Sequence, residues 1–233
     1  MHLCRYKDAE IVRTRDPALL DQCSIVVDVG GVFDAERQRF DHHQKTFSHT
    51  MNSLDTTKKW TIKLSSAGLV YFHYGREIIA GILGTSVEDK VTEKVFDKVY
   101  ENFVQEIDAI DNGISTHDGE GRYSISTNLS SRVSHLSPNW NDEEQDTDVG
   151  FYKAMELTKL EFLDRVNYYS IVWLAFWDIV SNSIKVRFSV HFSGRVLDFS
   201  QGRVPWIEYL FGLEKENNLT RDSSILFTDQ SGM

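Results

Sequence analysis

Short apolar runs alternate with polar segments in the first third of the chain. Residues 10–13 and residues 24–29 are rich in Ile and Val, and the second run reaches Asp28-Val29-Gly30-Gly31. We interpret both runs as strands of a parallel sheet, joined by a short helix over residues 17–22. Residues 36–43 predict a strand or an ordered loop, and residues 51–63 predict a polar, turn-like segment.

Helical patterns follow, and strand patterns return near the end. A helix is predicted to begin at Ser66 and to stop at Gly84. A second helical stretch is predicted over residues 150–181, with a break near Tyr169. Residues 184–192, 195–199 and 225–229 predict short strands around a helix that starts at Pro205.

Between these helices, apolar side chains recur every four residues from Val91 to Ile107. This spacing predicts a long helix with one buried stripe, starting near Ser86, and Asp111 is the next position on that stripe. The helix should end at Asn112-Gly113, which tolerate the left-handed conformation. Asp108 lies three residues before Asp111, so both carboxylates could reach one site at the helix end.

Composition is that of a globular protein. The 233 residues are 41% hydrophobic and 26% charged, and the two cysteines, Cys4 and Cys23, are too few for a disulfide framework. No apolar run approaches the roughly 18 residues of a membrane helix, and residues 1–20 show no targeting segment. We therefore expect a soluble, intracellular protein without a membrane partner.

The net charge is −10, and no long run of Lys and Arg is present. This weakens the case for a protein that wraps duplex nucleic acid, because such proteins normally present a basic face. A phosphoester substrate is still compatible with the charge. Carboxylates that bind divalent cations become locally positive once the metals are present.

Acidic and imidazole groups fall at the ends of three successive predicted elements: Asp28, the triplet Asp41-His42-His43, and the pair Asp108 and Asp111. The carboxyl end of a buried parallel strand is where open α/β sheets place ligands. Carboxylates and imidazoles suit Mn²⁺ or Mg²⁺, and two such ions about 3.5–4 Å apart hold the attacking and leaving oxygens of a phosphoryl transfer. Adjacent histidines diverge, so one can bind metal while the other contacts phosphate.

Each group also has an ordinary structural interpretation. Most carboxylates at strand ends are turn or cap residues, and a pair of histidines on a loop is usually exposed to solvent. Asp111 could cap its helix end through local hydrogen bonds. These separate interpretations do not explain why the three groups follow three successive elements.

The chain resembles the melanocyte-proliferating-gene family of exonucleases, in the wider group of Asp-His-His phosphoesterases. The resemblance covers nearly the whole chain and lies in residues 6–17, 26–32, 39–44, 63–69, 100–103, 107–114, 140–141 and 228–230. It implies an α/β fold in which helices pack on a parallel sheet. It also implies 3′-to-5′ exonuclease activity on single-stranded RNA, in the nucleus and mitochondrion, with two Mn²⁺ or Mg²⁺ ions.

The resemblance also implies a role for each residue of the motif. Asp28 matches the carboxylate that bridges the metals, His42 the metal-binding imidazole, and His43 the contact to substrate phosphate. Asp108 or Asp111 matches the last ligand, and Asp41 orients His42 or His43.

Several basic and aromatic residues lie near the motif in sequence. Arg13, Arg15 and Arg39, with Arg37 and Lys45, could contact phosphates, and ordinary surface charge is an equally good interpretation of each. Tyr71, Phe72 and Tyr74 could stack on bases, but their helical spacing favours core positions.

The sequence departs from the family pattern at both ends. The family's first motif, a His followed by acidic residues, has no match before Lys7, and the family's C-terminal portion is missing beyond Met233. We therefore expect a fragment, a splice form or an incomplete gene model that lacks the first strand and the C-terminal portion. Residues 1–145 would form the phosphoesterase-like metal domain, and residues 146–233 a helical linker and the start of a smaller α/β domain.

Three functions stay open at this point. The preferred one is a metal-dependent phosphodiesterase of the RNA exonuclease type, which we expect to be impaired in this chain. A small-substrate phosphohydrolase, such as a pyrophosphatase, shares the same triplet. A noncatalytic fragment that binds nucleic acid or a protein is the third, and it would take up no Mn²⁺.

Overall fold

The computed structural model describes residues 6, 8–143, 145–199, 206–216, 219 and 226–228. The chain divides into two compact units, Met1–Val166 and Asn167–Met233, which are described separately below. The boundary predicted at residues 145/146 lies before this division. Pro205 and residues 229–230, which carried parts of the sequence predictions, lie outside the described residues.

A small mixed sheet carries the first half of the predicted motif. Its strand order is β1-β3-β2, where β1 is Val26–Val27, β2 is Phe33–Asp34 and β3 is Arg39–Phe40. β1 runs parallel to β3, whereas β2 runs antiparallel to β3. The α/β class is therefore confirmed, but the described sheet of this unit is mixed rather than wholly parallel.

The strand predicted over residues 10–13 is wrong. This segment has no regular secondary structure, and Ile11 and Val12 are exposed. Strand propensity orders a segment only where a neighbouring strand can pair with it, and no described strand pairs with this one. The connecting helix is confirmed as α1, Pro17–Leu20, with Asp16 as its N-cap.

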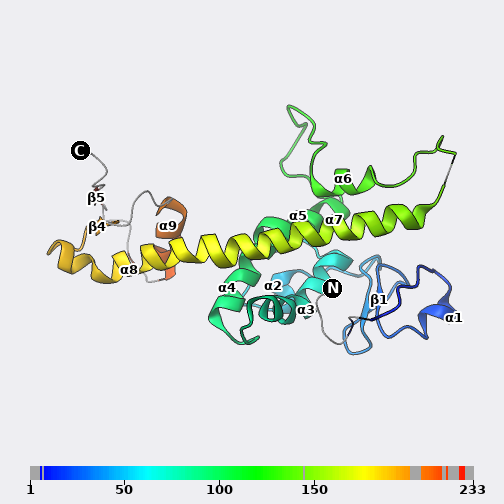
Figure 1. Ribbon diagram of the computed structural model, residues 1–233, viewed down its shortest axis with the longest axis horizontal. Helices are drawn as coiled ribbons and strands as arrows, with labels where there is room; N and C mark the ends of the chain where they lie inside the picture. The colour runs from blue at the N-terminus through cyan, green and yellow to red at the C-terminus, as the bar shows by residue number, and fades with distance from the viewer. Residues whose placement is uncertain are drawn as a thin grey trace. The chain divides into compact units, whose positions relative to one another are not determined.

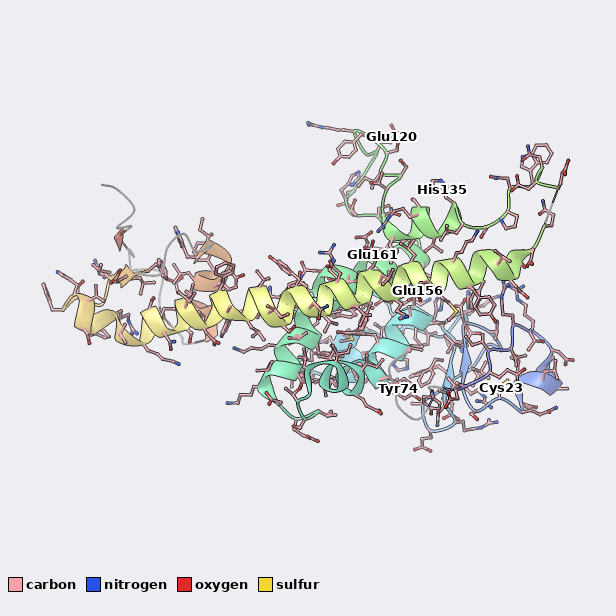
Figure 2. The ribbon with its side chains drawn as sticks, in the orientation of Figure 1. Cys23, Tyr74, Glu120, His135, Glu156 and Glu161 are labelled. Carbon is pink, nitrogen blue, oxygen red and sulfur yellow. The ribbon has the colours of Figure 1, made fainter. Side chains whose placement is uncertain are left out.

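The helix predicted between Ser66 and Gly84 is confirmed as α3, Ser66–Leu83. The side chain of Ser65 caps its first turn, and Gly84 ends it with a φ of 67°. The preceding segment is less irregular than expected, because Thr50 caps a short helix, α2, Met51–Leu54. Tyr74 of α3, labelled in Figure 2, packs edge-on against Phe40 of β3 at a centroid distance of 5.7 Å.

The long amphipathic helix exists, but its buried stripe shifts part-way along. α4, Lys90–Val99, starts after Asp89, whose side chain accepts from the N–H of Val91, so the start predicted at Ser86 is wrong. A π-helical turn, η2, Tyr100–Val104, then joins α4 to α5, Gln105–Asp111.

The extra residue of a π-helical turn rotates the following positions relative to a regular α-helix. Val95 and Val99 are buried before the turn, and Val104 and Asp108 are buried after it. Asp111 is exposed, so its predicted place on the buried stripe is wrong. Regular four-residue spacing assigned Asp111 to the core because it omitted this turn.

Two further helices complete the first unit. In Figure 1, α3 and α4 lie below α7, Thr147–Asn167, and α6, Leu129–Ser134, lies above it. Arg132 of α6 donates to Glu161 of α7 at 2.6 Å, and Glu161 is labelled in Figure 2. On the other side, the Phe162 ring lies 6.3 Å from the Tyr71 ring of α3.

The second unit is a helical stretch with a two-stranded sheet. Its elements are η3, Tyr168–Trp173, α8, Leu174–Val190, β4, Val196–Asp198, α9, Trp206–Glu216, and β5, Leu226–Thr228. The break predicted near Tyr169 corresponds to the π-helical η3. The strands predicted over residues 195–199 and 225–229 are confirmed as β4 and β5, which pair in parallel.

The strand predicted over residues 184–192 is wrong, because α8 continues to Val190. Apolar and polar residues alternate there, yet Val186 and Phe188 are exposed while Ile184 is buried. The hydroxyl of Ser183 donates to the carbonyl of Asp198 at 2.8 Å, which attaches the helix to β4. Tertiary packing thus overrides the strand pattern. Among the described residues, no helix is long and apolar enough to cross a membrane.

Two glycines of α3 should respond oppositely to substitution by alanine. In Gly68→Ala, the new Cβ would lie 2.2 Å from Oδ1 of Asp108, whereas Gly81→Ala meets nothing within 4 Å. We expect Gly68→Ala to lower the free energy of unfolding by roughly 1–3 kcal/mol. Gly81→Ala should raise it by about 0.4–1 kcal/mol, because it restricts the unfolded chain.

Urea denaturation of the two variants and the wild type measures both changes. Gly81→Ala controls for helix propensity, since it makes the same chemical change in the same helix. A Gly68→Ala protein as stable as Gly81→Ala would show that the close packing of Asp108 on α3 does not matter.

Candidate metal centre

The sheet brings the first two parts of the motif to one edge. Val27 of β1 pairs with Phe40 of the parallel strand β3, and the N–H of Asp28 donates to the carbonyl of Phe40 at 3.1 Å. Asp28 and His42 therefore both follow strand ends that lie side by side. Asp28 has a φ of 66°, an uncommon backbone conformation for a residue other than glycine.

His42 lies between two carboxylates from distant parts of the chain. Its Nδ1 is 3.8 Å from Oδ1 of Asp28, and its Nε2 is 3.2 Å from Oδ2 of Asp111. Asp28, His42 and His43 each offer one ligand atom, and these three atoms lie within 4.8 Å of one another. The structure therefore brings Asp28, His42 and Asp111 together, with His43 beside them. Their roles as metal ligands stay a prediction.

Asp41 positions His43. Its Oδ1 accepts from the ring Nδ1 of His43 at 2.6 Å and from the backbone N–H of His43 at 3.0 Å, while Oδ2 accepts from Gly31 at 2.7 Å. Burial alone would raise the pKa of Asp41, but these hydrogen bonds outweigh it and lower the pKa. The same contact raises the pKa of His43. The sequence left open whether Asp41 orients His42 or His43, and in the structure Asp41 hydrogen-bonds to His43.

His42 is buried and held by the start of α3. Its Nδ1 lies 2.9 Å from Oγ of Ser66 and accepts from the backbone N–H of Ser66 at 3.1 Å. Burial lowers the pKa of His42, although the nearby carboxylates of Asp111 and Asp28 oppose that change. A neutral imidazole is the form that binds metal ions.

Asp108 is separated from this cluster by its own hydrogen bonds. It is fully buried, and its Oδ1 accepts from the N–H of Ser65 at 2.9 Å and from the hydroxyl of Ser65 at 2.7 Å. Its Oδ2 accepts from the hydroxyl of Tyr100 at 3.0 Å. Through these hydrogen bonds, the carboxylate of Asp108 connects α5 with η2 and with the N-terminal cap of α3. Asp111 is the member of the pair that lies beside His42.

The donor set of the cluster fits a divalent metal ion. Carboxylate oxygens and imidazole nitrogen are ligands that Mn²⁺ accepts, and Mg²⁺ takes the carboxylates. The side chains of Asp28, His43 and Asp111 are 61%, 60% and 48% exposed. The centre is therefore open to solvent, with a buried imidazole at its base.

The predicted phosphate-binding arginines differ in their surroundings. Arg13 pairs with Asp148 and lies over the ring of Phe151 at 4.6 Å. Arg39 donates to backbone carbonyls, among them that of Cys23 at 3.0 Å. Arg15 is exposed, and the described part of the structure gives its side chain no hydrogen bond or ion pair. Phosphate contact by these three stays a prediction.

Lys63 and Ser66 lie at the centre, although the sequence interpretation gave them no role in it. The positive charge of Lys63 contributes to the lowered pKa of His42, and Lys63 Nζ lies 5.6 Å from the ring centroid of Phe47. Its backbone carbonyl accepts from Asn112 at 3.0 Å, which ties it to the residue after Asp111. Two sequence signals pointed to this segment: the predicted helix start at Ser66 and the family resemblance over residues 63–69. By contrast, Tyr71 and Tyr74 are buried, as their helical spacing favoured.

The whole chain matches one family. The MYG1 exonuclease family model, described as an uncharacterised protein family (UPF0160), matches residues 1–232. The chain belongs to this family. It is 50% identical over 232 residues to the MYG1 exonuclease of Rattus norvegicus, a match that covers 99% of this chain and 61% of the rat protein.

Other members of the family are also similar. The human MYG1 exonuclease is 49% identical over 234 residues, with coverage of 99% of this chain and 62% of the human protein. The MYG1 protein of Dictyostelium discoideum is 41% identical, covering 97% of this chain and 68% of its own length. The chain thus spans about three fifths of the length of the rat and human relatives. No solved structure matches it.

The burial of Asp108 can be tested by the pH dependence of stability. Burial raises the pKa of Asp108 from 3.8 to about 6. Between these two values the folded protein holds a proton that the unfolded chain has released, so stability falls as pH rises through this window. An increase of about two pKa units corresponds to a loss of roughly 3 kcal/mol above pH 6.

Asp108→Asn should remove this fall, because the amide does not ionise. We expect the difference in unfolding free energy between wild type and variant to change by roughly 3 kcal/mol from about pH 4 to pH 7. Urea denaturation at several pH values in a metal-free buffer measures it. A constant difference across this range would mean that Asp108 is not a buried, proton-holding carboxyl.

Proposed function

We propose that this chain carries the metal centre of a nuclease that hydrolyses single-stranded RNA from its 3′ end with Mn²⁺ or Mg²⁺. The observation that supports it best is the convergence of Asp28, His42 and Asp111, which come from three separate elements. The rat and human relatives bear the name exonuclease. The RNA substrate, the 3′ polarity and a place in the nucleus and mitochondrion rest on the family resemblance.

In this proposal, Asp28, His42 and Asp111 would hold the metal, with Asp28 in the bridging role that the family resemblance implies. Two divalent ions about 3.5–4 Å apart would supply charge stabilisation for the attacking and leaving oxygens of the phosphodiester. The buried base of the centre contributes rigidity, because His42 is held by Ser66 on one side. The exposed carboxylates leave the opposite side open for substrate.

His43 is suited to contact the phosphate. Asp41 holds its Nδ1 and raises the pKa of the ring, which favours the positively charged imidazolium. The remaining ring nitrogen, Nε2, can then donate to a phosphate oxygen, and the ring is exposed. We assign Arg15 to the same role, with Arg13 and Arg39 as further candidates for the RNA backbone.

The openness of the centre favours a polymer over a small substrate. A pyrophosphatase encloses a small anion in a narrow pocket, whereas three of the residues at this centre are about half exposed or more. An open centre can admit the end of an RNA strand while the rest of the strand extends into solvent. The third alternative, a noncatalytic binding fragment, can be distinguished from both enzymes because it would take up no Mn²⁺.

The two histidines should affect metal and phosphate differently. His42→Ala should weaken Mn²⁺ binding by at least tenfold, because it removes a ligand. His43→Ala should leave Mn²⁺ affinity within a few-fold of the wild type and should mainly weaken binding of inorganic phosphate to the Mn²⁺-loaded protein. Isothermal titration calorimetry with Mn²⁺, and then with phosphate, measures both. Equal losses of Mn²⁺ affinity would contradict the division of roles.

Hydrolysis of RNA tests the activity itself. The protein in Mn²⁺ should shorten a 5′-labelled single-stranded RNA stepwise, at the reduced rate expected of this chain, and a 3′ label should appear at once as a mononucleotide. Asp111→Asn should lower the rate by orders of magnitude, since each ~1.4 kcal/mol of lost stabilisation is about tenfold in rate. EDTA provides the metal-free control.

The substrates can be compared in the same assay. Pyrophosphate turnover without RNA hydrolysis would favour the small-substrate alternative. Mn²⁺ binding without either activity would leave a metal-binding module and would contradict the proposed nuclease.

A further inference from the structure

Ser66 offers two different hydrogen-bonding groups to one ring nitrogen. Its backbone N–H donates to Nδ1 of His42 at 3.1 Å, and its Oγ lies 2.9 Å from the same atom. A backbone N–H can only donate, so Nδ1 is an acceptor in the described arrangement. The neutral His42 ring therefore carries its proton on Nε2, which lies 3.2 Å from Oδ2 of Asp111.

Metal binding through Nε2 requires a different tautomer of this ring. A nitrogen must be unprotonated to bind a cation, and Nδ1 already faces both groups of Ser66. Nε2 lies 3.2 Å from Oδ2 of Asp111, whereas Nδ1 lies 3.8 Å from Oδ1 of Asp28 and is already engaged by Ser66, so Nε2 is the nitrogen better placed to bind a cation shared with a carboxylate. If Nε2 binds metal, the proton of the neutral ring must reside on Nδ1, where it needs an acceptor.

We infer that Ser66 is a positioning residue that serves both tautomers of His42. Its N–H donates to Nδ1 while Nε2 carries the proton. Once Nε2 binds a divalent cation, Nδ1 is protonated, gives up that contact and donates to Oγ of Ser66 instead. This inference rests on the proposed metal-binding function. The ring stays neutral throughout: one proton leaves Nε2 to water, one water proton joins Nδ1, and no net proton is released.

The position of Ser66 is fixed by its neighbours rather than by its own side chain. Ser65, the cap of α3, donates to the buried Asp108 through its N–H and its hydroxyl, at 2.9 and 2.7 Å. Oγ of Ser65 also accepts from the N–H of Gly68 at 3.3 Å. Because the cap is anchored in this way, removal of Oγ from Ser66 leaves the backbone N–H in place.

Ser66→Ala therefore separates the two roles. Alanine keeps the N–H that serves the metal-free tautomer and removes the acceptor that serves the metal-bound tautomer. Loss of a hydrogen-bond partner behind a metal-binding histidine typically costs 10–100-fold in metal affinity. We expect the Mn²⁺ dissociation constant of Ser66→Ala to rise by this factor, whereas the exposed-serine control Ser134→Ala should match the wild type.

The tautomer itself gives a readout that a change in packing would not produce. Long-range ¹H–¹⁵N spectra of the imidazole rings, with His42 assigned by comparison with His42→Ala, show which nitrogen carries the proton. Metal-free wild type and Ser66→Ala should both show Nε2–H. The wild type loaded with Cd²⁺, a diamagnetic substitute for Mn²⁺, should show Nδ1–H.

The outcomes separate the inference from the proposed function. Mn²⁺ uptake by the wild type with unchanged affinity in Ser66→Ala overturns the inference and leaves the metal centre standing. A Cd²⁺-loaded wild type that retains Nε2–H overturns it as well. If the wild type takes up no Mn²⁺, the proposed metal centre fails and the inference fails with it. Weaker binding in Ser66→Ala, with the tautomer change in the wild type, supports it.

Discussion

A buried carboxylate, that of Asp108, fixes the geometry on which the candidate centre depends. A carboxylate in the protein interior is tolerated only where hydrogen bonds replace the lost water, and here Ser65 and Tyr100 provide them. The close approach to Gly68 leaves no room for a side chain at that position. The start of α3 is thereby held, and with it the backbone N–H that orients His42.

Two aspartates on one short helix have different roles because their environments differ. Asp108 is buried among hydroxyl groups, while Asp111, one turn later, is exposed beside His42. The two histidines likewise differ in their surroundings. His42 is buried and its pKa is lowered, whereas His43 is exposed, paired with Asp41, and its pKa is raised. The two rings, with centroids 4.3 Å apart, thus have the different surroundings that the proposed ligand and phosphate-contact roles need.

Local patterns in the sequence were enough to predict part of the fold and part of the candidate metal centre. The helix from Ser66 to Gly84 carries its own start and stop signals, and the strand-end position of Asp28 identified it as a candidate ligand. The π-helical turn was not predictable, because the four-residue spacing of apolar side chains continues through it without a break. The contact between Ser66 and His42 joins residues 24 positions apart, so no local pattern reveals it. The strand predicted over residues 184–192 failed for the same reason: α8 packs on β4.

The π-helical turn at Tyr100–Val104 also determines where this helix can tolerate a change of length. Such a turn holds one residue more than an α-helical turn, so Val99 and Asp108 face the same core although they are nine positions apart. A deletion of one residue within the turn would restore a regular α-helix and still direct Asp108 inward. The same deletion between Val104 and Asp108 would rotate the helix end by about 100° and move Asp108 and Asp111 away from their present partners. A one-residue deletion is therefore compatible with this structure within η2, but not in the turn between Val104 and Asp108.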